Sequence, residues 1–274
     1  MTIHQTSEVA AMQRTIVVTG VASGIGAATA KRLRDDGERV IGADLHDADV
    51  VADLASAEGR AALAEGVARL PGGKSGAIVA NAGGGPPETC LQLNFFGAVA
   101  TLEALRPLLS EGAAPRAVAV SSIASLRPPP ANLVETLLAN DEAGARALAR
   151  RQYEMGELGE GREAGLALYG AAKLALNRWC RRAAASPAWA GAGIPLNVVA
   201  LGFYDTPAAA PVLNDREARG AMAAMAPLKG AFPGRADEAA AMIAFLVSPE
   251  NSQMTGQVLY ADAGVECRLR GATL

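Results

Sequence analysis

Residues 15–26 read TIVVTGVASGIG, and this stretch decides the fold. Its apolar first half predicts a buried strand, and the glycines predict a tight turn that leads into a helix. Glycine lets a backbone approach phosphates closely, and a helix N-terminus offers them free N–H groups and a positive dipole end. The spacing G-x-x-x-G-x-G differs from the commoner G-x-G-x-x-G, so a purely structural turn stays open at this point. The residues assigned to a dinucleotide here are Gly20, Ser23, Gly24, Ile25 and Gly26.

The rest of the chain repeats the alternation of short apolar runs with longer helical stretches. Expected strands are 15–19, 39–43, 50–52, 76–80, 116–121, 196–200 and 257–261. Expected helices are 25–36, 57–70, 91–110, 168–185 and 237–247. Val, Ile and Ala dominate the strands with little alternation, as in parallel sheets buried on both faces. The sequence therefore predicts an α/β Rossmann fold, a doubly wound parallel sheet of about seven strands.

Two segments interrupt the alternation and define the expected domain organisation. Residues 14–274 are expected to form a single domain after a flexible N-terminal extension, residues 1–13. A helical insertion, about residues 131–163, is rich in Ala, Glu and Arg. A long connection with several prolines spans about residues 202–233. Long connections in compact domains are often functional, so a mobile substrate lid and plain surface packing are both open for it.

Composition limits the classes of function. The chain has 274 residues, half of them hydrophobic, and a net charge of −3 with scattered Lys and Arg, so we expect a sizeable core and no nucleic-acid partner. No apolar run reaches the length of a membrane span and the N-terminus lacks a signal-peptide pattern, which indicates a cytoplasmic protein without a membrane partner. Cys90, Cys180 and Cys267 lack metal spacing, so they are expected to be reduced structural thiols, and no metal site is predicted.

Carboxylates after the second strand predict the adenosine end of a cofactor site. Asp44 lies 18 residues beyond Gly26, where a carboxylate can accept hydrogen bonds from ribose hydroxyls and repel a 2′-phosphate. No Lys or Arg follows directly to neutralise such a phosphate, so NAD is favoured over NADP; a preference for NADP would make His46 the suspected phosphate contact. A solvated turn aspartate is the alternative. Leu45, Asp53 and Leu54 are assigned to the same end, with the Asp53 side chain toward the adenine amino group.

A glycine-rich exit follows the strand predicted at 76–80. The segment reads Asn81-Ala82-Gly83-Gly84-Gly85 and would keep the backbone close to a cofactor, although a plain loop is an alternative. Asn81, Ala82 and Gly83 are therefore also assigned to the cofactor site.

The segment 169–173 reads YGAAK and supplies acid–base groups. Tyr169 and Lys173 are four residues apart and so share one face of a helix. A nearby ammonium favours the phenolate and moves a phenol with a pKa near 10 toward neutral pH. Ser121 and Ser122 end a strand at the crevice where open α/β sheets bind ligands. The pattern indicates hydride transfer by a nicotinamide with one proton managed by the protein, and a core tyrosine with a solvated lysine is the alternative.

Taken in order, these motifs resemble the short-chain dehydrogenase/reductase family over about residues 15–264. The matching pieces are TGVASGIG, Asp44, Asp53-Leu54, Asn81-Ala82-Gly83, Asn94 in LNFFGA, VSSIAS and YGAAK. The resemblance implies that Tyr169 is the general acid/base, that Ser122 polarises the carbonyl oxygen and that Asn94 holds a proton-relay water. It also implies that Lys173 binds the nicotinamide ribose and lowers the tyrosine pKa.

The chain also departs from the usual pattern of this family. Leu201-Gly202 stands where Pro-Gly is usual, which affects the wall beside the nicotinamide, and Asp262-Ala263-Gly264 replaces Asp-Gly-Gly. Gly202 and Thr206 are assigned to the cofactor, Thr206 through the carboxamide. The insertion and the stretch DLHDADVVADLASAEGR are similar to the bacterial 3-alpha-hydroxysteroid dehydrogenase/carbonyl reductase group. That likeness implies NAD-dependent interconversion of secondary alcohol and ketone on a bulky apolar, aromatic or steroid-like small molecule.

Other functions and the assembly state complete the expectations. A redox-silent nucleotide-binding regulatory protein would be expected to lack Tyr169, Lys173 or Ser122, and an epimerase or dehydratase would need a larger C-terminal domain. The resemblance implies a homodimer or homotetramer that packs through the helices containing Asn94 and Tyr169. An apolar stripe in the insertion needs a partner, either its own domain or a second subunit. The stripe consists of Leu133, Leu137, Leu138, Ala145 and Leu148.

Overall fold

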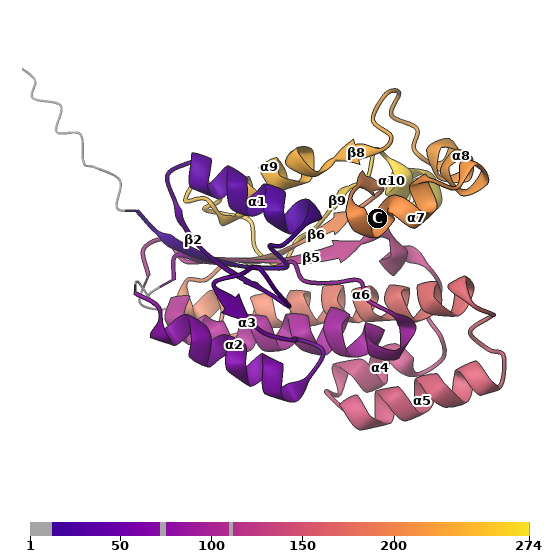
Figure 1. The fold of residues 1–274 in the computed structure, drawn as a ribbon, viewed down its shortest axis with the longest axis horizontal. Coiled ribbons are helices and arrows are strands. Elements are labelled where there is room, and N and C mark those ends of the chain that lie inside the picture. Colours follow the sequence, from indigo (N-terminus) through magenta and orange to yellow (C-terminus); the bar gives the residue numbers. More distant parts are fainter. Residues whose placement is uncertain (1–12, 72–74, 110–111, 274) are drawn as a thin grey trace, which may run out of the picture.

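The strand order places the glycine turn at the centre of the sheet. The computed structural model describes residues 13–71, 75–109 and 112–273. Seven parallel strands pair in the order β3-β2-β1-β4-β5-β6-β9, so the direction of winding reverses between β1 and β4 (Figure 1). Ligands of such sheets bind at this reversal, beyond the carboxyl ends of the strands. The strands are β1 Thr15–Thr19, β2 Arg39–Asp44, β3 Val50–Val51, β4 Ala77–Ala80, β5 Arg116–Ser122, β6 Leu196–Leu201 and β9 Val258–Ala261.

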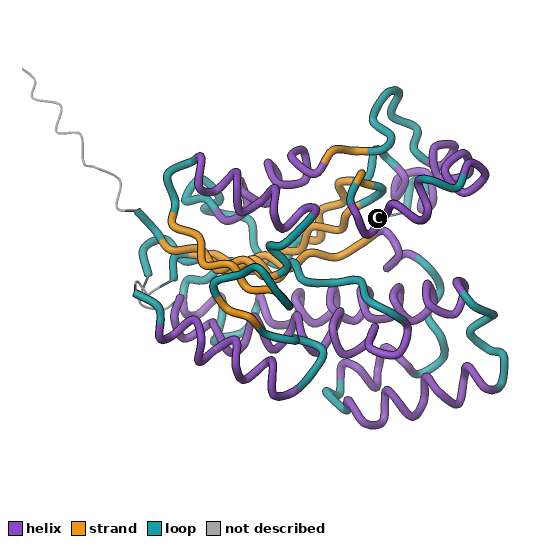
Figure 2. The backbone as a smooth tube through the Cα atoms, in the orientation of Figure 1, coloured by secondary structure: helices purple, strands orange, loops and turns teal. Residues whose placement is uncertain are grey.

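Helices cover both faces of the sheet, which lies between them as a middle layer (Figure 2). On one face α1 packs against α9, and on the other lie α2, α3 and α6. The covering helices are α1 Gly24–Asp35, α9 Ala236–Val247, α2 Ala57–Arg69, α3 Ala98–Leu109 and α6 Arg162–Ala184.

Smaller elements lie outside these layers. Two short strands, β7 and β8, pair in parallel with each other, and the helices α7, α8 and α10 lie near the carboxyl end of the sheet (Figure 1). These elements are β7 Tyr204–Asp205, β8 Gly234–Arg235, α7 Ala210–Leu213, α8 Arg216–Met225 and α10 Val265–Arg270. Single helical turns cover Pro87–Thr89, Ile123–Leu126, Ala190–Ala192 and Pro207–Ala209.

The core explains why the strands read as continuous apolar runs. Side chains alternate between the two faces of a strand. Ile16 and Val18 of β1 face the α1 and α9 side, whereas Val17 between them joins the cluster under α2, α3 and α6. All three are fully buried. Burial on both faces removes the polar positions that would otherwise mark a strand, as predicted for a parallel sheet.

The predicted fold class is confirmed, with corrections in two helices. The structure is a single-domain, doubly wound parallel sheet of seven strands. The helix predicted at 91–110 is two pieces, a π-helical segment Gln92–Gly97 followed by α3, because the Asn94 side chain donates to the Cys90 carbonyl four residues earlier. The helix predicted at 168–185 begins six residues earlier, at Arg162. Residue 110, the predicted end of the first helix, and residues 1–12 of the predicted extension lie outside the described residues.

The insertion folds onto its own domain. It contains α4 Leu133–Leu138 and α5 Glu142–Glu154, and α4 packs on both α5 and α6 (Figure 1). Leu133, Leu137 and Ala145 of the predicted stripe are fully buried in the cluster that α6 shares with the sheet. The apolar stripe therefore finds its partner within the chain, so it gives no argument for a second subunit.

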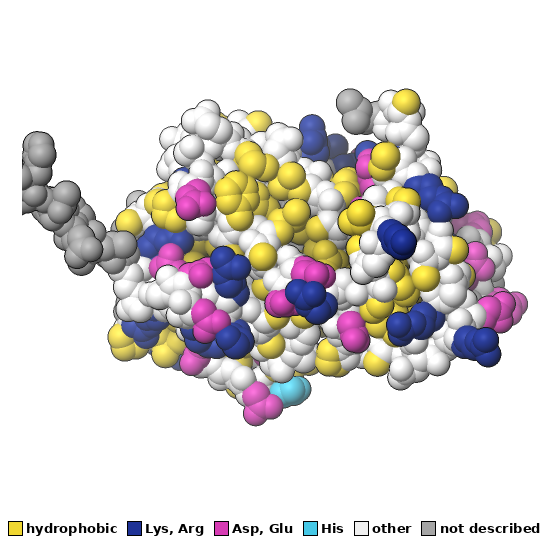
Figure 3. All heavy atoms as spheres, turned by 90° about the horizontal axis from the view of Figure 1, so that it is seen from above, with side chains coloured by type: hydrophobic (Ala, Val, Ile, Leu, Met, Phe, Trp, Pro, Cys, Tyr) yellow, Lys and Arg dark blue, Asp and Glu magenta, His cyan; other side chains and the backbone are white. Residues whose placement is uncertain are grey.

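The surface carries charges of both signs. On the face shown in Figure 3, Lys and Arg are dispersed among Asp and Glu rather than gathered into one patch. Within the part of the chain that the structure describes, no helix is both long and apolar enough to span a membrane.

Candidate active site

The glycine turn forms the floor of the site. Gly20 has φ +77°, and a Cβ at this residue would lie 2.7 Å from Asn81 Nδ2. A Cβ at Gly26 would lie only 1.8 Å from the Gly20 carbonyl oxygen. Ser23 precedes α1 without making a side-chain capping bond, which leaves N–H groups of the first turn to a ligand. A close backbone approach at a helix N-terminus fits the pyrophosphate of a dinucleotide.

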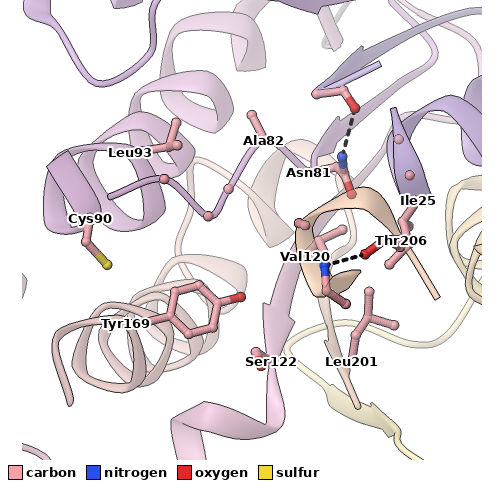
Figure 4. A pocket seen from close by; sticks show the side chains of 18 of the residues that line it. Ile25, Asn81, Ala82, Cys90, Leu93, Val120, Ser122, Tyr169, Leu201 and Thr206 are labelled. Atoms are coloured by element: carbon pink, nitrogen blue, oxygen red, sulfur yellow. Dashed lines mark hydrogen bonds between the residues drawn. The ribbon is translucent and has the colours of Figure 1, made fainter. Parts of the chain in front are cut away.

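One cavity of about 790 Å³ opens above this turn and collects nearly all the predicted site residues (Figure 4). Its walls include every residue assigned to the cofactor, together with Ser122. Asn94 does not line it. Among the described residues, no group of three or more His, Cys, Asp or Glu side chains could hold a metal ion.

Two carboxylates border the far end of the cavity, beyond β2. The Asp44 carboxylate accepts hydrogen bonds from the backbone N–H groups of Ala22, at 2.8 Å, and Leu45, at 2.7 Å. The exposed Asp53 carboxylate accepts one from Ala55 at 2.9 Å. These bonds fix the carboxylates in place and leave lone pairs on each for a ligand. No Lys or Arg among the described lining residues belongs to this end.

Asn81 ties the β4 exit to the glycine turn. Its side-chain amide donates to the carbonyl oxygens of Thr19, at 3.0 Å, and Gly20, at 3.3 Å. The backbone N–H groups of Asn81 and Ala82 both donate to the Thr19 hydroxyl. These bonds hold the loop after β4 against the loop after β1, at the place where the strand order reverses. The next residue, Gly83, is so close to Asn94 and Lys173 that a Cβ there would lie 2.9 Å from Asn94 Oδ1.

Asn94 lies behind the cavity wall, fully buried in the π-helical segment. Its amide nitrogen donates to the carbonyl oxygens of Gly84 and Cys90, at 2.9 and 2.8 Å, and its Oδ1 accepts from the Gly84 N–H at 2.9 Å. The side chain is therefore committed to bracing the 81–85 loop. The relay-water role that the resemblance implies for Asn94 stays a prediction.

The predicted acid–base group converges at the end of β5. The Tyr169 hydroxyl points into the cavity toward Ser122 (Figure 4), whose side chain acts to lower the pKa of the phenol. Ser121 is turned away, with its hydroxyl 3.4 Å from the Lys173 carbonyl oxygen. Lys173 is buried and donates to the Val120 carbonyl oxygen at 2.9 Å, its only hydrogen-bond acceptor among the described residues. Two of its three donors are thus left for a ligand, which fits ribose hydroxyls.

Burial dominates the electrostatics of this group. It raises the pKa of Tyr169 to about 12, with the Ser122 hydrogen bond acting in the opposite direction. It lowers the pKa of Lys173 to about 8, opposed by the thiols of Cys90 and Cys180. In the chain by itself Lys173 is not among the groups that shift the tyrosine pKa, so its lowering of that pKa stays a prediction. The ammonium nitrogen lies 5.5 Å from the centroid of the Tyr169 ring and donates to a carbonyl, so it does not offset the desolvation of the phenol.

The residues that depart from the usual family pattern, Leu201-Gly202 and Asp262-Ala263-Gly264, lie at the ends of β6 and β9. Gly202 is packed so closely that a Cβ would lie 2.6 Å from the Asp262 Cα. The Thr206 hydroxyl accepts from the Ala209 N–H at 3.3 Å, and its side chain lies beside Gly24 of the glycine turn. Through Thr206, the segment 202–233 therefore contacts the glycine turn at the cofactor end of the cavity.

Three residues that line the cavity near Tyr169 were not identified from the sequence: Cys90, Arg162 and Leu166. Cys90, taken to be only structural, lines the cavity and points toward Tyr169 (Figure 4). Arg162 and Leu166 also line it. They lie seven and three residues before Tyr169, so the helical period of 3.6 residues could have found them had α6 been predicted to begin at Arg162. No comparable signal marks Cys90, which enters through the loop after residue 85.

Comparisons with known proteins agree with this geometry. A family model described as enoyl-(acyl carrier protein) reductase matches residues 155–266. The 3-alpha-hydroxysteroid dehydrogenase/carbonyl reductase of Comamonas testosteroni is 37% identical, over 93% of this chain and 97% of that protein. The cis-4-hydroxycyclohexanecarboxylate dehydrogenase of Sinomonas cyclohexanicum is 33% identical, over 92% of this chain and 96% of that protein.

Solved structures extend the likeness to three dimensions. The 3-alpha-hydroxysteroid dehydrogenase of Pseudomonas sp. B-0831 complexed with NADH superposes with a TM-score of 0.84 at 36% identity, covering 95% of this chain and 100% of that one. RhlG of Pseudomonas aeruginosa, in a complex with NADP, has a TM-score of 0.69 at 26% identity, covering 92% and 96%. The resemblance carried by the motifs is thereby confirmed, and the chain is a member of the short-chain dehydrogenase/reductase family.

Proposed function

We propose that this protein is an NAD-dependent oxidoreductase that interconverts a secondary alcohol and a ketone on a bulky apolar small molecule. The observation that carries the proposal is the convergence of Tyr169, Ser122 and Lys173 at one end of a cavity whose other end is the glycine turn. Relatives over nearly the full chain are named as dehydrogenases and reductases of ring alcohols and carbonyl compounds, which supports a nicotinamide dinucleotide and CH–OH chemistry.

The residues divide the chemistry between them. A bound nicotinamide supplies or accepts the hydride. Tyr169 donates a proton to the ketone oxygen during reduction and takes it back during oxidation, and the Ser122 hydroxyl hydrogen-bonds to the same oxygen. Lys173 holds the ribose hydroxyls through its two spare donors. Asn94 acts as a positioning residue, because it fixes the loop that walls the cavity beside Lys173.

Asp44 supports NAD over NADP. Its carboxylate is held at the end of β2 by two backbone N–H groups, where it can accept from both ribose hydroxyls. A 2′-phosphate there would meet a fixed negative charge and, among the described lining residues of that end, no compensating cation. His46, the alternative phosphate contact, instead pairs with Asp47 on the exposed side of the loop.

A coupled assay tests the proposal directly. The protein is incubated with NAD⁺ or NADP⁺ and a set of secondary alcohols, including steroid, aryl and cyclic alcohols, while the absorbance of reduced cofactor is followed. We expect turnover of bulky apolar alcohols with NAD⁺ and a higher kcat/KM with NAD⁺ than with NADP⁺. Binding of NAD⁺ without turnover of any alcohol or ketone would instead favour a redox-silent regulatory protein.

The proposal extends to assembly and setting. We infer a homodimer or homotetramer in the cytoplasm, in line with the family and with three cysteines that form no disulfide. The single domain is taken to span residues 14–274, and the 202–233 connection is taken to be a lid over the substrate. Phe203, Tyr204 and Thr206 of that connection line the cavity, which supports its contact with ligands.

A further inference from the structure

Arg162 is a charged residue that the proposed chemistry leaves unused. Four of the described residues that line the cavity carry charged side chains: Asp44, Asp53, Lys173 and Arg162. The two carboxylates lie at the adenosine end, and Lys173 is buried beside Tyr169. Arg162 lies at the opposite wall, and its exposed side chain makes no hydrogen bond or ion pair with any described residue. A free guanidinium on a ligand cavity is a candidate for substrate recognition.

Helix α6 sets the distance between Arg162 and the reacting group. Arg162, Gly165, Leu166, Tyr169 and Lys173 all line the cavity, and their spacing of three and four residues places them on one face of the helix. Lys173 lies one turn beyond Tyr169 on the cofactor side. Arg162 lies two turns before Tyr169 on the other side, a separation of about 10 Å along the axis. A molecule held at the Tyr169 hydroxyl can therefore extend along this face of the helix toward Arg162.

The cavity residues of α6 between Arg162 and Tyr169, Gly165 and Leu166, carry no polar side chain. A Cβ at Gly165 would lie 3.5 Å from the Pro87 side chain, so α6 and the 86–90 loop are close together here. Leu93 and Leu166 also line the cavity. Apolar rings suit this lining, and a charged group of the ligand is best placed beyond it, at Arg162.

The glutamates next to Arg162 in the sequence form no ion pair with its guanidinium. Glu163 has its carboxylate against Gly159, and neither Glu160 nor Glu163 forms an ion pair with Arg162. The planar guanidinium matches a carboxylate through two parallel hydrogen bonds. We propose that Arg162 determines substrate specificity by binding a carboxylate on the substrate, about two helical turns from the reacting carbon. Resting on the proposed function, this assigns the substrate class as apolar ring ketones and alcohols that carry a distal carboxylate.

The test compares acids with their esters at two lengths. The ketones are para-acetylbenzoate and its biphenyl homologue, which places a second ring between acetyl and carboxylate, each as the acid and as the methyl ester. For Arg162→Leu we expect the KM of the biphenyl acid to rise at least about tenfold, as for loss of charge-assisted hydrogen bonds, while that of its ester stays unchanged. The shorter acid should be affected less, and Arg162→Lys should retain part of the preference. Arg146→Leu, an exposed arginine of α5 outside the cavity, is the matched control.

A binding measurement separates this inference from the proposed function. Calorimetry with NAD⁺ and the ketones measures affinity without turnover, since neither partner can donate a hydride. A preference for acid over ester that disappears in Arg162→Leu supports the inference even if no ketone is reduced, an outcome that would reject only the proposed function. If the esters are reduced but Arg162→Leu binds the biphenyl acid as tightly as the wild type, the inference is overturned and the proposed function stands.

Discussion

The buried ammonium of Lys173 couples the site to the stability of the fold. Its pKa is lowered to about 8 by burial, whereas the unfolded chain keeps the ordinary value of 10.5. Between these values the unfolded state binds more protons, so the stability lost to Lys173 is regained as the pH rises through 8 toward 10.5. The cost is therefore largest below pH 8, where the folded state must bury the charge.

This linkage predicts a measurable difference in denaturation. Relative to Lys173→Met, the free energy of unfolding of the wild type should rise by about 1 kcal/mol between pH 7 and pH 9. Urea denaturation at the two pH values measures it. Lys31→Met, which removes an exposed ammonium from α1, serves as the control and should track the wild type at both. Parallel behaviour of Lys173→Met and the wild type would contradict a buried charged lysine.

Asp44 carries the prediction for cofactor choice. Asp44→Ala removes both the ribose acceptor and the charge that opposes a 2′-phosphate, so NAD⁺ binding should weaken while discrimination against NADP⁺ relaxes. The ratio of kcat/KM for the two cofactors is the measurement. Asp47→Asn removes a charge from the same loop outside the cavity and should leave the ratio unchanged. A wild type that prefers NADP⁺ would refute the assignment of Asp44.

At the residue scale, the sequence predicted which residues lie in the candidate site better than it predicted their pKa values and hydrogen bonds. Tyr169 and Lys173 could be selected from their helical spacing and their place after a strand, whereas Ser122 was preferred to Ser121 through the family resemblance. The pKa of Tyr169 could not be predicted, because it depends on how deeply the phenol is buried and on the direction of the Lys173 ammonium. The commitment of the Asn94 amide to Gly84 and Cys90 likewise depends on contacts between separate segments.

The glycine turn is the element on which cofactor binding depends. A Cβ at Gly26 would overlap the Gly20 carbonyl oxygen, so Gly26→Ala must displace the turn from β1. We expect the Kd for NADH to rise at least about tenfold, equal to 1.4 kcal/mol. Fluorescence titration of NADH measures it. Gly220→Ala, on α8 with open space around its Cβ position, should bind NADH like the wild type, and tight binding by Gly26→Ala would exclude a ligand role for the turn.

The bounds of helices and strands were predicted well where the hydrophobic pattern sets them. They were predicted less well where contacts between separate segments set them. The strand Thr15–Thr19 matches the predicted residues, since an uninterrupted apolar run sets its bounds. The π-helical segment Gln92–Gly97 has no sequence period of its own, because it arises from the bonds of Asn94 to a distant loop and to the preceding turn. The early start of α6 at Arg162 was missed because the charged insertion runs into the helix without a proline or a capping side chain.

At the scale of the whole molecule, the insertion determines which surfaces remain for a second subunit. Its apolar stripe is buried in its own domain, while Tyr153 and Met155 at the end of α5 remain exposed at 56% and 64%. If the insertion forms the interface, Tyr153→Glu and Met155→Glu should reduce the mass measured by light scattering to 27.9 kDa, whereas the wild type should measure a dimer or tetramer. Leu269→Glu on α10 is the exposed control. An unchanged mass in all variants would exclude this interface.

The central claim is that one phenol exchanges the proton while the rest of the site holds the dinucleotide. The most direct test is a single-turnover measurement of ketone reduction by the enzyme–NADH complex, with Tyr169→Phe compared with the wild type. Tyr260→Phe, on β9 outside the cavity, is the control. We expect Tyr169→Phe to lose at least about 10²-fold in rate and to bind NADH with unchanged affinity, because only the proton donor is removed. A rate within a few-fold of the wild type would contradict the account.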